Sequence, residues 1–274
     1  MRTPICAGTF YPKNQNELLS ELNLLFEKNP KFYFPDAKGI IVPHAGYLYS
    51  GYVAAQTYKA ISEVKKRNFV ILGVDHHAMR VIATSDEDWI TPLGTAKINR
   101  EYLNKITKEH AVIVDKIATD REHSIEVQLP FIQYLFDKFT FTPVQLPRIS
   151  YQEIIELSNI LKNNDSFFIA SSDLTHYGSQ YNFVPPESIY DPNDYVKKLD
   201  REIIEIISRL DSKTFFEYIE NNESTVCGYI PIALLIEITK KIGAKKIELI
   251  SYDTSFSISH DTSAIVGYAG IVII

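Results

Sequence analysis

Residues 39–46 read Gly-Ile-Ile-Val-Pro-His-Ala-Gly, a short β-branched run that ends at a proline and passes at once to His44. Two further apolar runs likewise lead into aspartate or histidine: 69–73, followed by Asp75-His76-His77, and 167–172, followed by Asp173-Leu174-Thr175-His176. In an open α/β sheet, ligands and catalytic groups sit at the carboxyl ends of parallel strands. If the three strands are neighbours, imidazoles and carboxylates from distant parts of the chain meet at one sheet edge, which predicts a metal or acid/base site.

Helical patterns alternate with β-branched runs over most of the chain. The patterns predict helices over 14–28, 51–66, 99–109, 124–136 (divided by Pro130), 151–162, 194–208, 212–221 and 228–242. They predict strands over 39–43, 68–74, 111–114, 139–146, 166–171, 246–252 and 264–273, and loops over 86–94 and 178–193. Strongly apolar strands between helices imply a sheet covered on both faces. We therefore expect a single α/β domain over residues 1–274, with a mostly parallel or mixed central sheet whose strand order stays open.

The composition favours a globular protein that binds neither nucleic acid nor membranes. The net charge is −6 and no run of five basic residues occurs, which argues against a phosphate-backbone binder. No apolar stretch approaches the roughly 18 residues that span a bilayer. The N-terminus lacks the apolar core of a signal peptide, so we expect a cytoplasmic protein with reduced thiols.

The turn after residue 43 is suited to present an imidazole. Pro43 stiffens the strand exit, and Ala45 and Gly46 leave room for His44 to face an ion or substrate, with Tyr47 able to lean over the pocket. The alternative is a tight turn with an incidental histidine.

Two adjacent histidines follow the second strand. Along an extended backbone adjacent side chains point to opposite faces, so His76 and His77 should not both bind one ion. One should be a ligand, while the other binds substrate or packs outside; the sequence does not choose between them.

The third strand end offers a carboxylate and an imidazole three residues apart. On a helical turn Asp173 and His176 would share a face and could form a general acid/base pair. The alternative is helix capping by Ser172 or Asp173.

Cys227 precedes a predicted helix, where the helix dipole favours a thiolate. A thiolate can act as a metal ligand or as a nucleophile. The alternative is a small buried hydrophobe. Cys6 has no such context and is expected to pack in the core.

Several of these segments occur together in an order that resembles the Memo family, known in prokaryotes as AmmeMemoRadiSam system protein B. The matching segments are 7–12, 42–47, 71–77, 91–94, 122–130, 171–178 and 227–228. The family is similar in fold to the class III extradiol dioxygenases, which hold non-haem Fe(II) with two histidines and a carboxylate. Here Val74-Asp75 precede His76, where the family more often has Pro-Ser.

The resemblance implies roles for residues of this chain. His44 and His76 would be imidazole ligands, and Cys227 would take the third place. His176 would fall where the dioxygenases place an acid/base histidine, with Asp173 close by. His77 and His123 would line or support the pocket, which together with Tyr47 makes them the expected substrate-binding residues. Fe(II) is the expected cofactor, with copper and zinc as alternatives because a thiolate is softer than a carboxylate.

Three functions follow as hypotheses. The first is a metal-dependent redox or oxygenase-like enzyme. The second is a non-catalytic module that binds a peptide or phosphorylated ligand in the same pocket. The third is a zinc-dependent hydrolase with Asp173 or His176 as base. The ligand is a small molecule or peptide, and the family's prokaryotic name implies a functional link to radical-SAM and AMMECR-like proteins.

Overall fold

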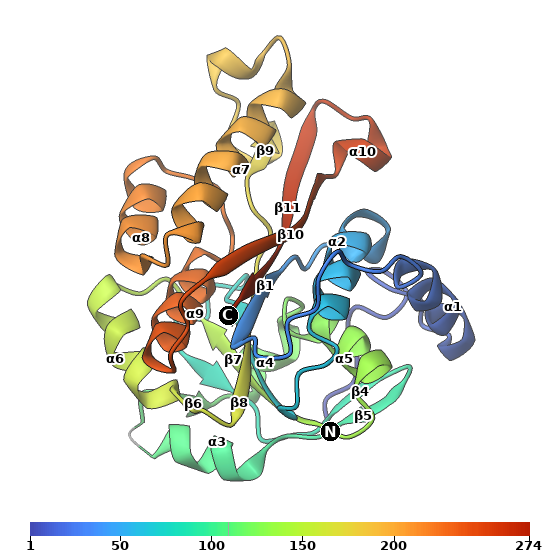
Figure 1. The fold of residues 1–274 in the computed structure, drawn as a ribbon, viewed down its shortest axis with the longest axis vertical. Coiled ribbons are helices and arrows are strands. Elements are labelled where there is room, and N and C mark those ends of the chain that lie inside the picture. The colour runs from blue at the N-terminus through green and yellow to red at the C-terminus, as the bar shows by residue number, and fades with distance from the viewer. Residues whose placement is uncertain (109) are drawn as a thin grey trace.

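The β-branched runs form a central mixed sheet in the computed structural model, which describes residues 1–108 and 110–274 (Figure 1). Its strands are β1 (Gly39–Val42), β2 (Asn68–Val74), β3 (Ala83–Thr84), β6 (Ile113–Val114), β7 (Thr140–Leu146), β8 (Ser166–Ser171), β9 (His176–Gly178), β10 (Ile247–Thr254) and β11 (Ala264–Ile273). The order is β10-β11-β1-β8-β2-β7-β3-β6, and β9 pairs with β11. Strands β1, β8, β2 and β7 are parallel, whereas β11 runs antiparallel to β1 and β10. The predicted α/β class with a mixed sheet is confirmed.

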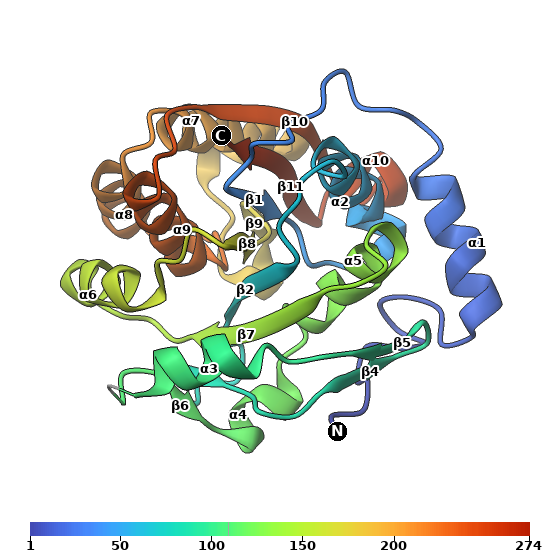
Figure 2. The same ribbon diagram turned by 60° about the horizontal axis from the view of Figure 1, so that its bottom comes forward.

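Helices cover both faces of this sheet (Figures 1 and 2). They are α1 (Gln15–Leu25), α2 (Tyr47–Ala60), α3 (Arg100–Thr107), α4 (Lys116–Arg121), α5 (Leu129–Leu135), α6 (Tyr151–Leu161), α7 (Pro192–Ser208), α8 (Ser212–Asn221), α9 (Tyr229–Lys241) and α10 (Phe256–Ser259). Short 3₁₀ turns lie at Glu126–Gln128, Ser179–Tyr181 and Pro186–Ser188. The predicted helix over 99–109 extends to residue 109, which lies outside the described residues. No described helix combines the length and the apolar character needed to cross a bilayer.

Alternation along the strands divides the core between the two faces. Ile40 and Val42 pack with α1, α2 and α5, whereas Ile41 packs with α6 and α9 on the other face. All three are fully buried, as expected for a central strand covered on both sides.

Some local predictions were wrong, and one short helix was not predicted. Residues 86–94, expected to be a loop, contain β4 (Trp89–Thr91) and lead into β5 (Gly94–Ala96), a hairpin. Helix α2 begins at Tyr47, four residues before the predicted start, because residue 46 is already its N-cap. Residues 116–121 form α4, which the pattern did not reveal since only six residues are helical.

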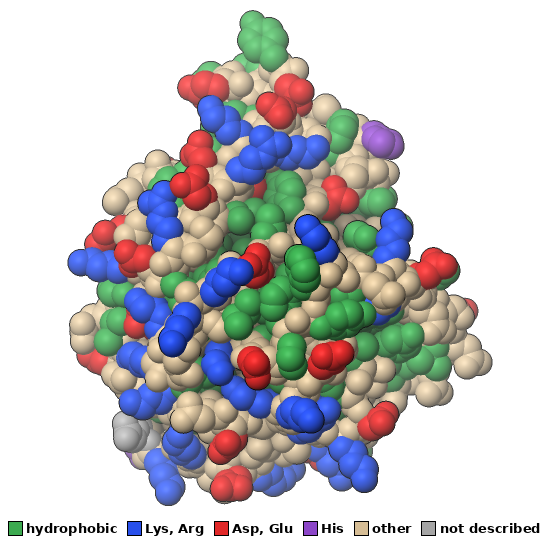
Figure 3. All heavy atoms as spheres, in the orientation of Figure 1, with side chains coloured by type: hydrophobic (Ala, Val, Ile, Leu, Met, Phe, Trp, Pro, Cys, Tyr) green, Lys and Arg blue, Asp and Glu red, His purple; other side chains and the backbone are tan. Residues whose placement is uncertain are grey.

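Strand β10 forms one edge of the sheet and carries charged side chains there. Lys246 and Glu248 form an ion pair beside Leu249, which is 47% exposed. Figure 3 shows the face of the molecule seen in Figure 1, with hydrophobic side chains in its middle surrounded by interspersed Lys, Arg, Asp and Glu. Charges along an edge strand discourage pairing with another chain.

A buried aspartate on α7 should make stability depend on pH. Asp200 accepts hydrogen bonds from Thr175 N at 3.1 Å and Tyr252 Oη at 2.7 Å. Burial raises its pKa to about 6, although these hydrogen bonds oppose the shift. Because the folded state holds this proton more tightly than the unfolded state, the contribution of Asp200 to stability falls as pH rises from about 4 to about 6.

Asp200→Asn, which keeps the shape and removes the charge, should abolish this contribution. The free energy of urea unfolding of the variant relative to wild type should rise by roughly 2–3 kcal/mol between pH 4 and pH 7. Other titrating groups are common to both proteins and cancel. Parallel stability curves across this range would contradict the assignment.

Candidate metal centre

The three strand ends named by the sequence are neighbours. β8 lies between β1 and β2, so His44, Asp173 and His76, each two residues beyond its strand, reach the same sheet edge. Cys227, from the segment before α9, joins them there. One donor atom from each of His44, His76 and Cys227 lies within 4.8 Å of the others. The geometric condition for a shared metal site is met.

Hydrogen bonds determine which nitrogen of His44 is free. Ser171 Oγ donates its one proton to Ser124 O at 2.6 Å, so it must accept from His44 Nδ1 at 3.1 Å. The Nε2 atom of His44 therefore carries a lone pair, and it lies 3.3 Å from Cys227 Sγ. Burial, followed by the neighbouring His76, lowers the pKa of His44 to about 3, so the ring is neutral at pH 7. A neutral imidazole with its other nitrogen donating is the usual form of a metal ligand.

His76 is oriented by a buried carboxylate. Glu122 Oε1 lies 2.9 Å from His76 Nδ1, and Glu122 Oε2 accepts from His76 N at 3.1 Å. Burial alone would raise the pKa of Glu122, but the hydrogen bonds from His76 and Ser124 and the nearness of the His76 and His123 rings lower it to about 2. An ionised Glu122 holds the proton of His76 on Nδ1. The lone pair of Nε2 is then available to a metal ion.

Cys227 is a half-buried cysteine whose surroundings oppose the predicted helix-activated thiolate. Burial, followed by Asp173, raises the pKa of Cys227 well above its ordinary value. The dipole of α9 is outweighed because the sulfur lies in a desolvated place beside a carboxylate. Gly228 allows the segment that carries Cys227 to lie close to Ser172, since a Cβ at residue 228 would lie 2.5 Å from Ser172 Cβ. In this setting a cation would compete with the proton for the sulfur.

His176 and Asp173 meet at the same place by a route other than the predicted helical turn. Residues 172–175 are not helical, and His176 begins β9. His176 Nδ1 lies 2.9 Å from Leu174 O and 3.0 Å from Thr225 O, so it must donate and leave Nε2 free. Asp173 accepts from His44 N at 2.8 Å, and burial raises the pKa of Asp173. Asp173, His176 and Cys227 form a second set of donors within 4.8 Å of one another.

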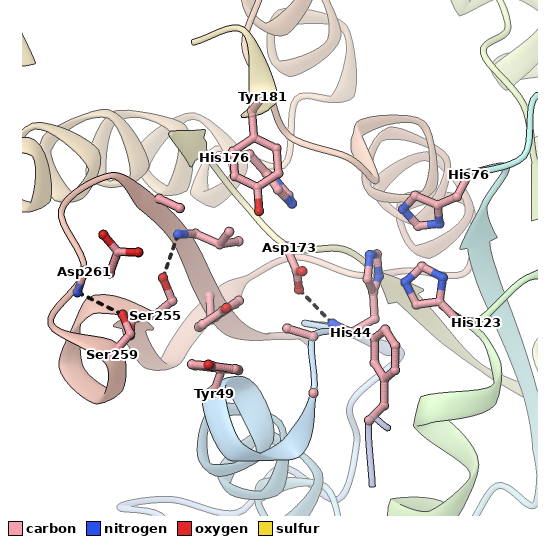
Figure 4. Close-up of a pocket in the computed structure, with 16 residues that line it drawn as sticks. His44, Tyr49, His76, His123, Asp173, His176, Tyr181, Ser255, Ser259 and Asp261 are labelled. Atoms are coloured by element: carbon pink, nitrogen blue, oxygen red, sulfur yellow. Dashed lines mark hydrogen bonds between the residues drawn. The ribbon is translucent and has the colours of Figure 1, made fainter. Parts of the chain in front are cut away.

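His44, His76, Asp173 and His176 line the inner end of a cavity of about 430 Å³ (Figure 4). His123 lies beside His44 and His76, with ring centroids 5.3 and 4.5 Å away. Burial, followed by His44, lowers the pKa of His123 to about 3. A third set of donors within 4.8 Å joins His76, Glu122 and His123.

The comparisons with known proteins agree with this architecture. The family model described as Memo-like protein matches residues 2–272. The chain belongs to the Memo family. It is 37% identical to a MEMO1 family protein of Methanosarcina barkeri over the whole of both chains. It is 38% identical to a MEMO1 family protein of Thermoplasma volcanium, covering 99% of this chain and 98% of that protein. It is also 38% identical to one of Pyrococcus abyssi, covering 99% of each chain.

Two expected pocket residues of this Memo family member lie elsewhere. Tyr47 is buried in the core, where its hydroxyl donates to Val127 O at 2.7 Å and its ring packs on Phe131. His77 is exposed and its Nε2 lies 2.8 Å from Arg121 O, so it packs outside the cavity. Of the three expected substrate-binding residues, only His123 lines the cavity, and Tyr49 lines it where residue 47 was expected.

Sequence reasoning did not assign three residues that shape this site in the Memo chain. Glu122 directly precedes His123. An acidic residue next to a histidine is the sequence signal that could have indicated its role in the site. Tyr49 lies two residues beyond Tyr47 in the first turn of α2, but its direction depends on where that helix begins. Tyr181 lies within the predicted irregular segment 178–193, and it packs edge-on to His176 at 5.0 Å.

Proposed function

We propose that this Memo family protein is a redox or oxygenase-like enzyme with Fe(II), or alternatively copper, held by His44 Nε2, His76 Nε2 and Cys227 Sγ. The observation that supports this is the convergence of two lone-pair nitrogens and a thiol, each histidine oriented through its Nδ1 proton. Three protein ligands leave coordination positions open for substrate.

The residues present fit a soft or borderline cation. Two neutral imidazoles suit iron, copper and zinc alike, and a thiolate raises affinity for copper and zinc. A bound redox-active ion would supply the electron-transfer chemistry. Ionisation of Cys227 on metal binding would release a proton, since burial raises the pKa of that thiol in the metal-free chain.

Proton transfer would fall to His176. Its Nε2 is free and faces the cavity, while its Nδ1 proton is held by two backbone carbonyls. A base fixed in one tautomer can accept a proton from a hydroxyl of the substrate without first reorienting. Asp173 beside it would stabilise the imidazolium that forms. His123 and Phe10, whose rings lie 5.0 Å apart, would pack against the substrate.

The proposal is tested by anaerobic Fe(II) titration, with copper and zinc titrated in parallel, on wild type, His44→Ala and Cys227→Ala. We expect one ion per chain in wild type and loss of binding in both variants. His260→Ala, an exposed histidine outside the cavity, is the matched control and should bind as wild type. Loaded wild type should consume O₂ with a phenol substrate, and His176→Gln should slow this while keeping the metal.

Undiminished binding in His44→Ala and Cys227→Ala would reject the site. Zinc as the bound ion together with ester or amide turnover would instead support a hydrolase. A ligand that binds equally well without metal, with no O₂ uptake, would support a binding module.

A further inference from the structure

The cavity has a second end that the metal centre does not use. Beyond the histidines its walls come from the first turn of α2, from β11 and from the α10 segment between β10 and β11. Figure 4 shows Asp261, Ser259 and Ser255 at this end, His76 and His123 at the other, and Tyr49 and Tyr181 between them. Ser259 and Asp261 are exposed, so this end is the mouth of the cavity.

The wall at the mouth is held by hydrogen bonds across the hairpin. Ser255 N donates to Val266 O at 2.8 Å, and Val266 N donates to Ser255 Oγ at 3.0 Å. Ser263 donates to Asp261 Oδ1 from both its N and its Oγ, at 2.8 and 2.7 Å. Within the described chain no donor reaches Asp261 Oδ2. One carboxylate oxygen is thus fixed in place while the other is available to a ligand.

The charges along the cavity have one sign. None of the described residues that line it is Lys or Arg, whereas Asp173 lies at the inner end and Asp261 at the mouth. The hydrogen bonds from Ser263 lower the pKa of Asp261, so it is ionised at pH 7. An anionic group at the mouth would meet a carboxylate with no cation to balance it.

Aromatic side chains line the cavity next to the mouth. Tyr49, Tyr181 and Tyr268 are among the lining residues, and Figure 4 shows Tyr49 and Tyr181 between the mouth and the histidines. Burial, then Asp173, then the phenols of Tyr181 and Tyr49 raise the pKa of Tyr268, so the ring is uncharged. Tyrosine faces attract ammonium and guanidinium groups through the ring quadrupole. A carboxylate beside such faces favours an organic cation over an anion or a neutral group.

We propose that the mouth of this cavity is a subsite for an organic cation, in which Asp261 pairs with an ammonium or guanidinium group of a ligand that extends inward between Tyr49 and Tyr181. The ligand would then place an oxygen at the inner end and its cationic group at the mouth. Such a subsite would disfavour a phosphorylated ligand, which the binding-module hypothesis included. The proposal rests on the proposed function only in taking this cavity as the ligand site.

The test compares three probes that share one ring and differ in charge. Tyramine carries an ammonium group, 4-ethylphenol is neutral, and 3-(4-hydroxyphenyl)propionate carries a carboxylate. Their dissociation constants are measured at pH 7.5 by calorimetry or ligand-observed NMR, on metal-free and on metal-loaded protein. We expect tyramine to bind at least about tenfold more tightly than the carboxylate probe, with 4-ethylphenol between them.

Asp261→Asn keeps the oxygen that accepts from Ser263 and removes the charge. It should weaken tyramine about fivefold, leave 4-ethylphenol unchanged and strengthen the carboxylate probe. Asp137→Asn makes the same charge change at an exposed position outside the cavity and should change nothing. Equal affinity for the three probes, preference for the carboxylate, an unchanged tyramine affinity in Asp261→Asn, or no tyramine binding up to about 10 mM would overturn the subsite.

Measurements on metal-free and on metal-loaded protein test this inference independently of the proposed function. Charge preference in protein that binds no metal would leave the subsite standing and remove the metal centre. Metal binding without charge preference would do the reverse.

Discussion

Replacing His76 with alanine should weaken Fe(II) binding at least about 100-fold, whereas replacing its neighbour His77 should leave the dissociation constant within about twofold. One ring nitrogen of His76 lies within 4.8 Å of donor atoms of His44 and Cys227, and its Nδ1 is 2.9 Å from Glu122 Oε1. His77 is turned away and uses its Nε2 on Arg121 O. The measurement is an anaerobic titration of each variant followed by spectroscopy of the bound ion.

A graded variant tests whether orientation contributes to this affinity. Glu122→Gln leaves all three proposed metal ligands in place but replaces the ionised oxygen that holds the Nδ1 proton of His76, and should cost about 10–100-fold in affinity. His77→Ala serves as the matched control for a lost imidazole at this turn. Loss of binding in His77→Ala with retention in His76→Ala would show that the ligands are exchanged.

Replacing Glu126 with glutamine should lower the free energy of unfolding by about 3–5 kcal/mol. Glu126 is fully buried and accepts from Arg2, from Ile5 N and Cys6 N, and from Tyr11 Oη. Glutamine removes the charge that compensates Arg2, which is itself 2% exposed. An uncompensated buried guanidinium and a poorly matched set of donors should loosen the N-terminal segment. Urea denaturation followed by circular dichroism measures the change.

The control for this effect is an exposed carboxylate in a single ion pair. Glu205 pairs with Arg209 on the surface of α7, and Glu205→Gln should leave the unfolding midpoint almost unchanged. Arg2→Met combined with Glu126→Met should be more stable than Glu126→Gln, since no buried charge is then left alone. A midpoint for Glu126→Gln equal to that of Glu205→Gln would rule out a structural role for the buried pair.

The convergence at the metal centre could be predicted because it depends on strand ends. His44, His76 and Asp173 each follow an apolar run, and parallel strands deliver their carboxyl ends to one edge. The hydrophobic patterns did not show whether β1, β8 and β2 are adjacent. The tertiary structure shows that they are. The place of Cys227 came from family resemblance, because nothing in a single cysteine before a helix indicates which strands lie beneath it.

Side-chain direction at the turns could not be predicted in the same way. Tyr47 and Tyr49 are two residues apart, and one packs in the core while the other lines the cavity, because α2 begins at residue 47 rather than 51. Asp173 and His176 meet through β9 rather than through a helical turn.

By itself the sequence determined the apolar runs, the residues that follow them and hence the α/β class, because hydrophobic periodicity is a local property of the chain. Only the tertiary structure decided that Nε2 of His44, His76 and His176 would be free, because the proton on each ring goes to a partner from another segment: Ser171, Glu122, or Thr225 together with Leu174. The same holds for Cys227, where burial outweighs the helix dipole. Such contacts depend on how distant segments pack, and periodicity carries no information about them.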